Sequence, residues 1–568
     1  MNFTALIGAL QRVPREWRPK LLECLPGYNR QMFTADLLAG VTVGVVALPL
    51  AMAFAIASGV TPQAGIYTAI VGGFIVAALG GSRIQVSGPT GAFVVIVAGI
   101  IAQHGLSGLL MVTMMAGVIL VLIAVTGLAN AVRYIPRPVV IGFTNGIALL
   151  IASTQIRDFL GIRLAENPGE FFARMAALAA AVDTINPAAV AVAVISLALI
   201  LLVPRKLPRV PGSIVALVAG AAAVALFDLP IETIGSRFGS IPASLPAFEV
   251  PEFRADLIVP LFPSALTVAL LAAVESLLSA VVADGMTGDR HNPRAELLAQ
   301  GAANIVVPMV GGIPVTGAIA RTATNFRAGA RTPVASIVHA LTLLVIVLVL
   351  APLSAYVPLA TLAAVLFVVA YNMGEWREIP GILRLDLADK SVWLITFVLT
   401  VVADLTVAVE VGIALAALLF ISRVTDTSSV SIVTPEYISE GHVHVLQDKD
   451  IPPYVSILRI HGPFLFGMTD KLRDETEDLS RFGPIVILRL RNMTAIDATG
   501  LHAIKEFHDR LVQSGRTLLL CGARRQPAEF LAQSDIVAHI GPENVLPHVQ
   551  AAIERAKQIA AQWGEQVA

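Results

Sequence analysis

The tetrapeptide Pro89-Thr90-Gly91-Ala92 returns, with one change, as Val315-Thr316-Gly317-Ala318. Each copy opens an apolar stretch, and the two copies lie at comparable distances into the two halves of the apolar part of the chain. Proline and glycine at such a point predict a broken helix, whose N-terminus presents unpaired N–H groups and partial positive charge. The small side chains leave these amides uncovered, so the pair predicts an anion site. The alternative interpretation is that the motifs only permit kinks or close helix packing.

The chain around these motifs is too apolar for a soluble protein. Of its 568 residues, 56% are hydrophobic and 14% are charged, and the mean hydropathy is +0.78. We therefore predict a membrane protein surrounded by lipid. A net charge of -1 gives no sign of a nucleic-acid partner, and two cysteines provide neither a disulfide framework nor a metal site. His104, His291 and His339 are scattered and no nucleophile–base pair stands out, so we predict no enzyme, metal or cofactor.

Apolar stretches long enough to cross the hydrocarbon core of a bilayer recur from about residue 36 to about residue 423. We predict fourteen spans, at 36–58, 63–81, 87–104, 107–128, 137–158, 184–203, 209–228, 258–284, 293–312, 316–328, 333–354, 357–373, 389–405 and 407–423. The two motifs open the third and the tenth span. Seven spans separate them, an odd number, so equivalent halves run with opposite topology. The predicted fold is a 7+7 inverted repeat.

Positive residues accumulate in cytoplasmic loops. If the N-terminus is cytoplasmic, the cytoplasmic loops hold about thirteen Lys/Arg and the outside loops roughly five, so the count favours this orientation. An even number of spans then leaves the C-terminus inside as well. We predict a multi-pass inner-membrane protein with a cytoplasmic segment at 1–35 and a transmembrane domain at 36–423. Beyond it, charges return and alternating strand-like runs appear. We assign a linker at 424–452, a cytoplasmic α/β domain at 453–556 and a tail at 557–568.

Two ionisable residues fall within the predicted spans near the motifs. Glu275 lies in the eighth span, where a carboxylate costs about 3 kcal/mol or more unless it is hydrated, paired or protonated. Ser279 follows one helical turn later and can face the same cavity. Arg321 comes three residues after Ala318 and places a fixed positive charge within one turn of the predicted anion site. The alternative is that Glu275 and Arg321 form a structural pair.

Seven motifs occur in an order that resembles the SulP sulfate-permease family, whose animal members form solute carrier family 26. They are Asp36-Leu37-Leu38-Ala39-Gly40-Val41-Thr42-Val43-Gly44, Ala47-Leu48-Pro49, Gly65-Ile66-Tyr67, Ser87-Gly88-Pro89-Thr90-Gly91, Glu275-Ser276-Leu277-Leu278, Gly311-Gly312-Ile313-Pro314 and Arg331-Thr332-Pro333. The resemblance covers nearly the whole chain. It implies a core domain, made of spans one to four and eight to eleven, that moves like an elevator past a gate domain. It also implies a homodimer.

By position, the resemblance implies that the anion is bound by Thr90, Gly91, Gly317, Ala318 and Ile319, with the ring of Phe54 against it. The sodium-bicarbonate symporters of this family have Asp at the position of Glu275 and Thr at that of Ile319. Sodium prefers oxygen ligands, so Ile319 argues against it, although Glu275, Ser279 and backbone carbonyls could partly replace the missing hydroxyl. A protonatable Glu275 favours H⁺ as the coupling ion.

The C-terminal domain resembles the STAS fold of sulfate transporters and anti-sigma-factor antagonists. Its marker is Asp497-Ala498-Thr499-Gly500, which matches the Asp-Ser-Ser-Gly loop of bacterial antagonists. Thr499 occupies the phosphoacceptor position, where a helix N-terminus would stabilise a phosphate. The alternative is that the loop only caps the helix and the fold persists without phosphorylation. A cytoplasmic protein partner of this domain is a further expectation.

The predicted function is secondary active transport of a small inorganic or carboxylate anion, namely sulfate, bicarbonate or a C4-dicarboxylate, coupled to protons through Glu275. The alternatives are a sodium-coupled bicarbonate symporter, an anion exchanger, an uncoupled channel, and a sensor that relays anion occupancy to partners of the STAS domain. Leu50 stands where the channel and motor relatives have a polar Gln, which favours a transporter.

Overall fold

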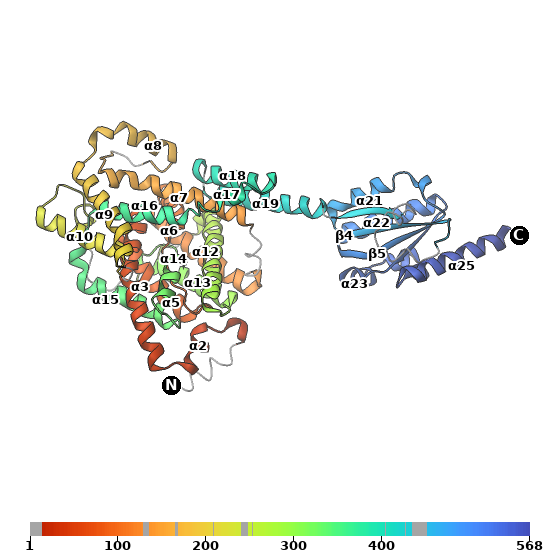
Figure 1. Cartoon of the computed structure of the whole chain (residues 1–568), viewed down its shortest axis with the longest axis horizontal. Helices are drawn as coiled ribbons and strands as arrows, with labels where there is room; N and C mark the ends of the chain where they lie inside the picture. The colour runs from red at the N-terminus through yellow and green to blue at the C-terminus, as the bar shows by residue number, and fades with distance from the viewer. Residues whose placement is uncertain are drawn as a thin grey trace. The chain divides into compact units, whose positions relative to one another are not determined.

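The computed structural model describes residues 14–128, 136–164, 168–207, 210–239, 248–252, 254–403, 405–426, 428–433 and 451–567. The chain divides into two compact units, Met1–Ala414 and Leu415–Ala568 (Figure 1). Residues 1–13 of the predicted N-terminal segment and 434–450 of the predicted linker lie outside the described residues.

The first unit is helical. Its helices are α2 (Lys20–Cys24), α3 (Arg30–Ala57), α4 (Pro62–Tyr67), α5 (Gly73–Leu79), α6 (Ala92–Thr126), α7 (Arg137–Leu160), α8 (Phe171–Ala180), α9 (Pro187–Lys206), α10 (Gly212–Phe227), α11 (Ile234–Phe238), α12 (Ile258–Thr287), α13 (Pro293–Val306), α14 (Ile319–Arg327), α15 (Val334–Ser354), α16 (Leu359–Met373), α17 (Ile379–Ile382) and α18 (Leu387–Val402). Helix α19 (Leu405–Asp426) begins in this unit and continues into the second. A π-helical turn, η3 (Thr68–Gly72), joins α4 to α5. Every predicted span overlaps at least one of these elements.

Six stretches of the described residues are long and apolar enough to cross a membrane by length and composition alone. They are Arg30–Ala57, Pro62–Leu79, Ala92–Thr126, Arg137–Leu160, Pro187–Lys206 and Ala255–Thr287. The count of fourteen spans therefore stays a prediction. The third and fourth predicted spans form one element, α6, which breaks at Gly105 with φ 68° and ψ −171°. Glycine is the residue that adopts such a conformation readily.

The helices of this unit pack in two groups (Figure 1). Helices α3, α4, α5, α6, α12, α13, α14 and α15 pack mainly on one another, and we name them the core group. Helices α7, α9, α10, α16 and α18 form the gate group. Glycines let helices of one group approach closely: a Cβ added at Gly117 of α6 would lie 2.8 Å from the carbonyl oxygen of Gly301 in α13.

Gly65→Ala should destabilise the core group strongly. The added Cβ would lie 2.0 Å from the carbonyl oxygen of Ala51 in α3, and backbone cannot move aside as a side chain can. We expect a loss of roughly 1–3 kcal/mol, the usual cost of overpacking, measured as a lower midpoint of thermal unfolding in detergent. Gly285→Ala in α12, with no atom within 4 Å of the new Cβ, is the control. Equal midpoints for the two variants would contradict the close α3–α4 contact.

The second unit is an α/β domain. Its elements are β3 (Ser429–Val433), β4 (Val455–Phe464), α21 (Thr469–Glu475), β5 (Ile485–Ile496), α22 (Ala498–Gln513), β6 (Thr517–Cys521), α23 (Arg525–Gln533), α24 (Ile536–Ile540), β7 (Val545–Leu546) and α25 (Val549–Val567). The sheet order is β3-β4-β5-β6-β7, with β3 antiparallel to β4 and the other pairs parallel.

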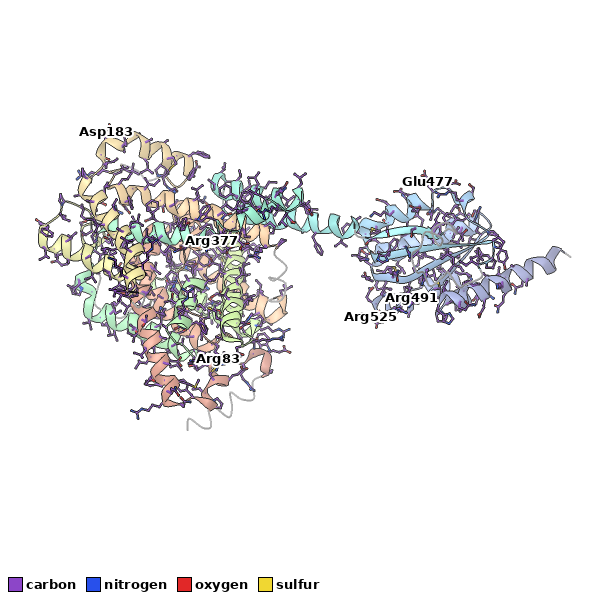
Figure 2. All side chains as sticks on the ribbon, viewed as in Figure 1. Arg83, Asp183, Arg377, Glu477, Arg491 and Arg525 are labelled. Carbon is purple, nitrogen blue, oxygen red and sulfur yellow. The ribbon has the colours of Figure 1, made fainter. Side chains whose placement is uncertain are left out.

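Both faces of this sheet are covered. Helices α21 to α24 pack on one face and α25 packs on the other. Charged side chains such as Glu477, Arg491 and Arg525 lie at the surface (Figure 2). Strand β3 lies within the range assigned to the linker, and α25 continues through residues 557–567, which were assigned to a tail.

Candidate anion-binding site

The two repeated motifs meet in a short two-stranded sheet. Strand β1 (Ser87–Gly88) pairs antiparallel with β2 (Thr316–Gly317), with Ser87 opposite Gly317. Helix α6 begins four residues after Gly88, and α14 begins two residues after Gly317. The N-termini of two helices from opposite halves of the unit therefore lie at one junction, as the inverted repeat predicts.

Side chains from neighbouring helices hold these non-helical segments in place. Asn304 of α13 bonds both backbone groups of Val315, accepting from its N–H and donating to its carbonyl oxygen, each at 2.9 Å. The hydroxyl of Ser276 in α12 accepts from the N–H of Gly317 at 3.0 Å. Buried backbone groups outside helices need such partners in an apolar surrounding.

Gly91 lies against aromatic and apolar side chains from both helix groups. A Cβ added there would lie 3.3 Å from Cε1 of Phe54 in α3. It would also lie 3.2 Å from Cδ1 of Ile151 in α7 and 3.2 Å from Sδ of Met373 in α16. The structure therefore brings Phe54 beside the start of α6, where the resemblance placed an aromatic ring against the anion.

Glu275 of α12 also reaches this junction. The hydroxyl of Thr90 donates a hydrogen bond of 2.9 Å to Oε2 of Glu275. Glu275 and Ile319 line a cavity of about 80 Å³, and Ile319 is 41% exposed. The same cavity is also lined by Phe143 of α7 and by Glu375, which follows α16. The carboxylate and both motifs thus meet where the core and gate groups face one another.

Ser279 does not share this cavity with Glu275. It is buried, and its hydroxyl pairs at 3.1 Å with that of Thr322 in α14. The hydroxyl of Thr322 in turn accepts from the N–H of Val86 at 3.0 Å. Four residues turn an α-helix by about 400°, so positions one turn apart diverge by roughly 40°. Ser279 consequently supports the strand junction from behind instead of lining the cavity.

Arg321 also lies behind the junction. Its side chain is 3% exposed, and one guanidinium nitrogen, Nη2, donates to the carbonyl oxygen of Pro89. The other, Nη1, has no hydrogen-bond partner among the described residues. No ion pair joins Arg321 to Glu275 in the part of the chain that the structure describes: Glu275 bonds Thr90, and Arg321 bonds the carbonyl oxygen of Pro89. Arg321 therefore tethers the segment before α6 and adds positive charge behind it.

A second buried carboxylate, Glu296 of α13, lies behind β1. It accepts from the N–H of Gly81 at 3.0 Å, from Nε2 of Gln85 at 2.9 Å and from Nε2 of Gln300 at 3.0 Å. Gln300 also donates to the hydroxyl of Ser87 in β1 at 3.0 Å. Glu296 was not among the predicted site residues, although an acidic residue within the predicted ninth span was a usable signal.

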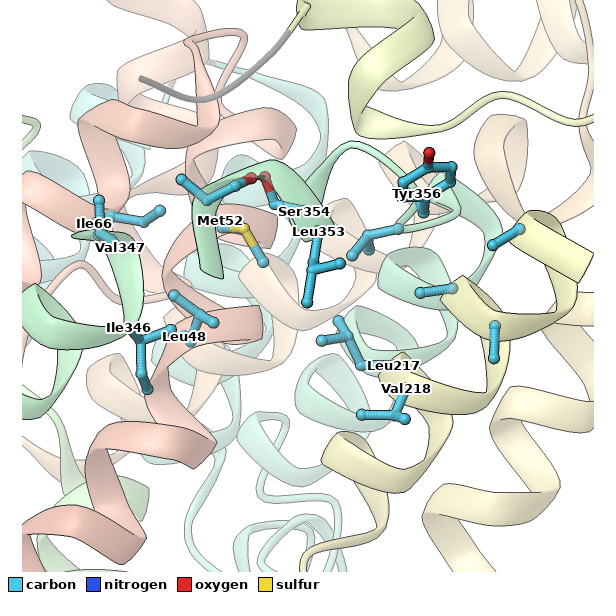
Figure 3. Close-up of a pocket in the computed structure, with 15 residues that line it drawn as sticks. Leu48, Met52, Ile66, Leu217, Val218, Ile346, Val347, Leu353, Ser354 and Tyr356 are labelled. Carbon is cyan, nitrogen blue, oxygen red and sulfur yellow. Dashed lines mark hydrogen bonds between the residues drawn. The ribbon is translucent and has the colours of Figure 1, made fainter. Parts of the chain in front are cut away.

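Two larger cavities of the helical unit differ sharply in polarity. A cavity of about 500 Å³ between α3, α10 and α15 is lined by apolar side chains such as Leu48, Met52 and Leu217, and it offers an anion few donors (Figure 3). Another of about 440 Å³ is lined by Val95 of α6, by Thr154 and by Arg174. Arg174 is buried and donates to the hydroxyl of Ser153 at 3.0 Å.

In the α/β unit, Thr499 lies in the first turn of α22 and is exposed. The preceding Asp497 caps this helix, because its Oδ1 accepts from the N–H of Gly500 at 2.8 Å. Its Oδ2 accepts from the N–H of Phe466 at 3.1 Å. The loop thus caps the helix, while the hydroxyl that would accept a phosphate stays accessible. Phosphorylation of Thr499 remains a prediction.

Comparison with known proteins gives the same two units. The family model described as Sulfate permease family matches residues 33–396, and the STAS domain matches residues 447–552. The putative sulfate transporter YvdB of Bacillus subtilis is 42% identical over 524 residues, covering 92% of this chain and 97% of that protein. The bicarbonate transporter BicA of Picosynechococcus is 29% identical over 546 residues, covering 92% and 94%.

Solved structures agree with these matches. The overall structure of SLC26A9 superimposes with a TM-score of 0.85 at 18% identity, covering 100% of this chain and 96% of that one. The transmembrane domain of a cyanobacterial bicarbonate transporter, BicA, gives a TM-score of 0.61 at 31% identity, covering 69% and 98%. The first likeness shows the fold alone.

Proposed function

The chain belongs to the sulfate permease family, whose members are anion transporters and not enzymes, and from this premise we propose that it is a proton-coupled carrier of a small anion. The proposed substrates are sulfate, bicarbonate and C4-dicarboxylates. The observation that carries the proposal is the β1–β2 junction, where two helix N-termini meet beside Glu275.

Three features of the junction favour an anion. Backbone N–H groups at the starts of α6 and α14 provide hydrogen-bond donors together with the positive ends of two helix dipoles. Arg321, behind the junction, adds a fixed positive charge. Thr90 provides a hydroxyl, which donates to Glu275 in this structure and becomes free to donate to an anion when a protonated Glu275 donates to Thr90 instead. YvdB is named a putative sulfate transporter and BicA a bicarbonate transporter, which supports an inorganic oxyanion.

The surroundings of Glu275 favour a proton over sodium as the coupling ion. A sodium ion needs several oxygen ligands, and the cavity beside Glu275 is lined mainly by apolar side chains, including Ile319. A proton needs only the carboxylate itself. Ser279, whose hydroxyl would be a further oxygen ligand, bonds Thr322 instead. Glu275 is therefore the residue we assign to proton coupling.

The walls of the cavity support an elevator-like movement. Glu275 and Ile319 belong to the core group, whereas Phe143 belongs to α7 of the gate group. Sliding of one group along the other would expose the anion and the proton site together. In this proposal the chain lies in the inner membrane with both termini in the cytoplasm, and it forms a homodimer.

Uptake into proteoliposomes tests the proposal. Radiolabelled sulfate, bicarbonate and succinate should be offered in turn, with an imposed proton or sodium gradient. We expect one of these anions to accumulate against its own gradient when protons are supplied, and not when sodium is supplied. Accumulation driven by sodium would contradict proton coupling. Flux that requires an internal anion would indicate an exchanger, and conductive flux without coupling would indicate a channel.

A further inference from the structure

Two histidines and one aspartate lie together on the surface of the α/β unit. His508 and Asp509 are consecutive residues of α22, and His539 lies in α24. Nε2 of His539 is 2.7 Å from Oδ1 of Asp509. The rings of His508 and His539 meet edge to face, with centroids 5.3 Å apart at an angle of 65°. One ligand atom from each of the three residues lies within 4.8 Å of the other two.

We propose that His508, Asp509 and His539 form a binding site for a divalent transition metal of the zinc class. Two imidazoles and a carboxylate are a common donor set for Zn²⁺, and imidazole also suits Co²⁺, Ni²⁺ and Cu²⁺. Metal–ligand bonds of about 2 Å place the ligand atoms of a tetrahedral site roughly 3.3 Å apart. Side-chain rotations that shift the ligand atoms by ~1 Å would therefore close the site. One position remains for water.

The surroundings allow a metal to enter and bind. His539 is 39% exposed and Asp509 is 51% exposed at their side chains, so an ion can reach them from solvent. Nδ1 of His508 is buried and has no hydrogen-bond partner among the described residues, so binding need not break a bond at that atom.

The two helices are already held together beside the site. An ion pair between Lys505 of α22 and Asp535, which precedes α24, joins them close to the three ligands. The ligands are therefore brought together before a metal arrives, which lowers the entropy lost on binding. An occupied site would cross-link α24 to α22, the helix whose first turn carries Thr499.

The plainer interpretation is that His539 and Asp509 form an ordinary surface ion pair, with His508 packed beside it. Such exposed pairs contribute little to stability. This interpretation predicts that loss of either histidine changes no metal affinity, so metal titration separates the two.

The test is to purify the full-length protein in detergent without a histidine tag and to titrate it with Co²⁺. We expect visible absorption bands of histidine-ligated Co²⁺, one equivalent bound per chain, and their loss when Zn²⁺ is added. His539→Asn and, separately, Asp509→Asn should weaken binding at least about tenfold, since loss of a second-shell contact alone costs 10–100-fold. His502→Asn, which removes an exposed histidine of the same helix, should bind as the wild type does.

A second measurement guards against misfolded variants. Zn²⁺ should raise the midpoint of thermal unfolding of the wild type and of His502→Asn, and should leave that of His539→Asn unchanged. The proposal is overturned if wild-type protein binds Co²⁺ no more tightly than His539→Asn does, or if His502→Asn loses binding equally.

Discussion

Glu275→Gln is expected to abolish proton-driven accumulation of the anion while leaving its binding nearly intact. Glutamine keeps the size of the side chain, and its amide oxygen can still accept the hydrogen bond from Thr90. It cannot bind or release a proton. Uptake driven by an inward proton gradient should therefore fall to the level reached by equilibration. The measurement is the accumulation ratio in proteoliposomes, together with the dissociation constant for the anion.

Two comparisons sharpen this experiment. Counterflow, in which labelled anion outside exchanges with unlabelled anion inside, requires no proton and should persist in Glu275→Gln. Glu252→Gln removes an exposed carboxylate of the same unit and should accumulate the anion as the wild type does. If Glu275→Gln still concentrates the anion under a proton gradient, Glu275 is not the coupling residue.

Gly91→Val is expected to lower uptake about a hundredfold, a loss of roughly 2.8 kcal/mol in transition-state stability. A Cβ at Gly91 would lie within 3.2–3.3 Å of Phe54, Ile151 and Met373, and a branched side chain would cover the amides at the start of α6. The nearest atoms are the outer parts of side chains, so the fold can adjust. The measurement is the initial rate of uptake at saturating and at low anion concentration.

Gly99→Val is the matched control, because Gly99 lies in the same helix and a Cβ there has no atom within 4 Å. Its uptake should equal that of the wild type, and both variants should elute as folded protein. Equal uptake by Gly91→Val and Gly99→Val would show that the start of α6 does not bind the anion.

The C-terminal unit and the helix positions could be predicted from the sequence. Apolar stretches about 20 residues long and alternating strand runs are local signals, so the predicted ranges overlap the observed helices and the sheet lies near its assigned range. The element boundaries were less predictable. The predicted spans 87–104 and 107–128 leave a boundary at residues 105–106, and α6 breaks there at Gly105, whereas β3 lies in the assigned linker because that strand forms only with β4 as its partner.

The candidate site was partly predictable. Each motif contains a glycine and a small neighbouring residue that indicate a break in a helix, so Thr90, Gly91, Gly317 and Ala318 could be selected without the structure. The individual roles of Ser279 and Arg321 could not be predicted from the sequence. A helix rotation of about 40° decides whether a side chain lines a cavity or packs behind it, and helical periodicity does not determine that rotation against neighbouring helices.

The sequence by itself determined the membrane class, the two repeated motifs and the presence of a carboxylate and a guanidinium near them, because these depend on composition and on local patterns, and the resemblance to a known family indicated the STAS domain. Only the tertiary structure decided that β1 pairs with β2 and that Thr90 reaches Glu275 across 185 residues. It also decided that His508, Asp509 and His539 converge from two helices. Such contacts depend on how helices rotate and pack, and packing is a property of all the neighbours at once.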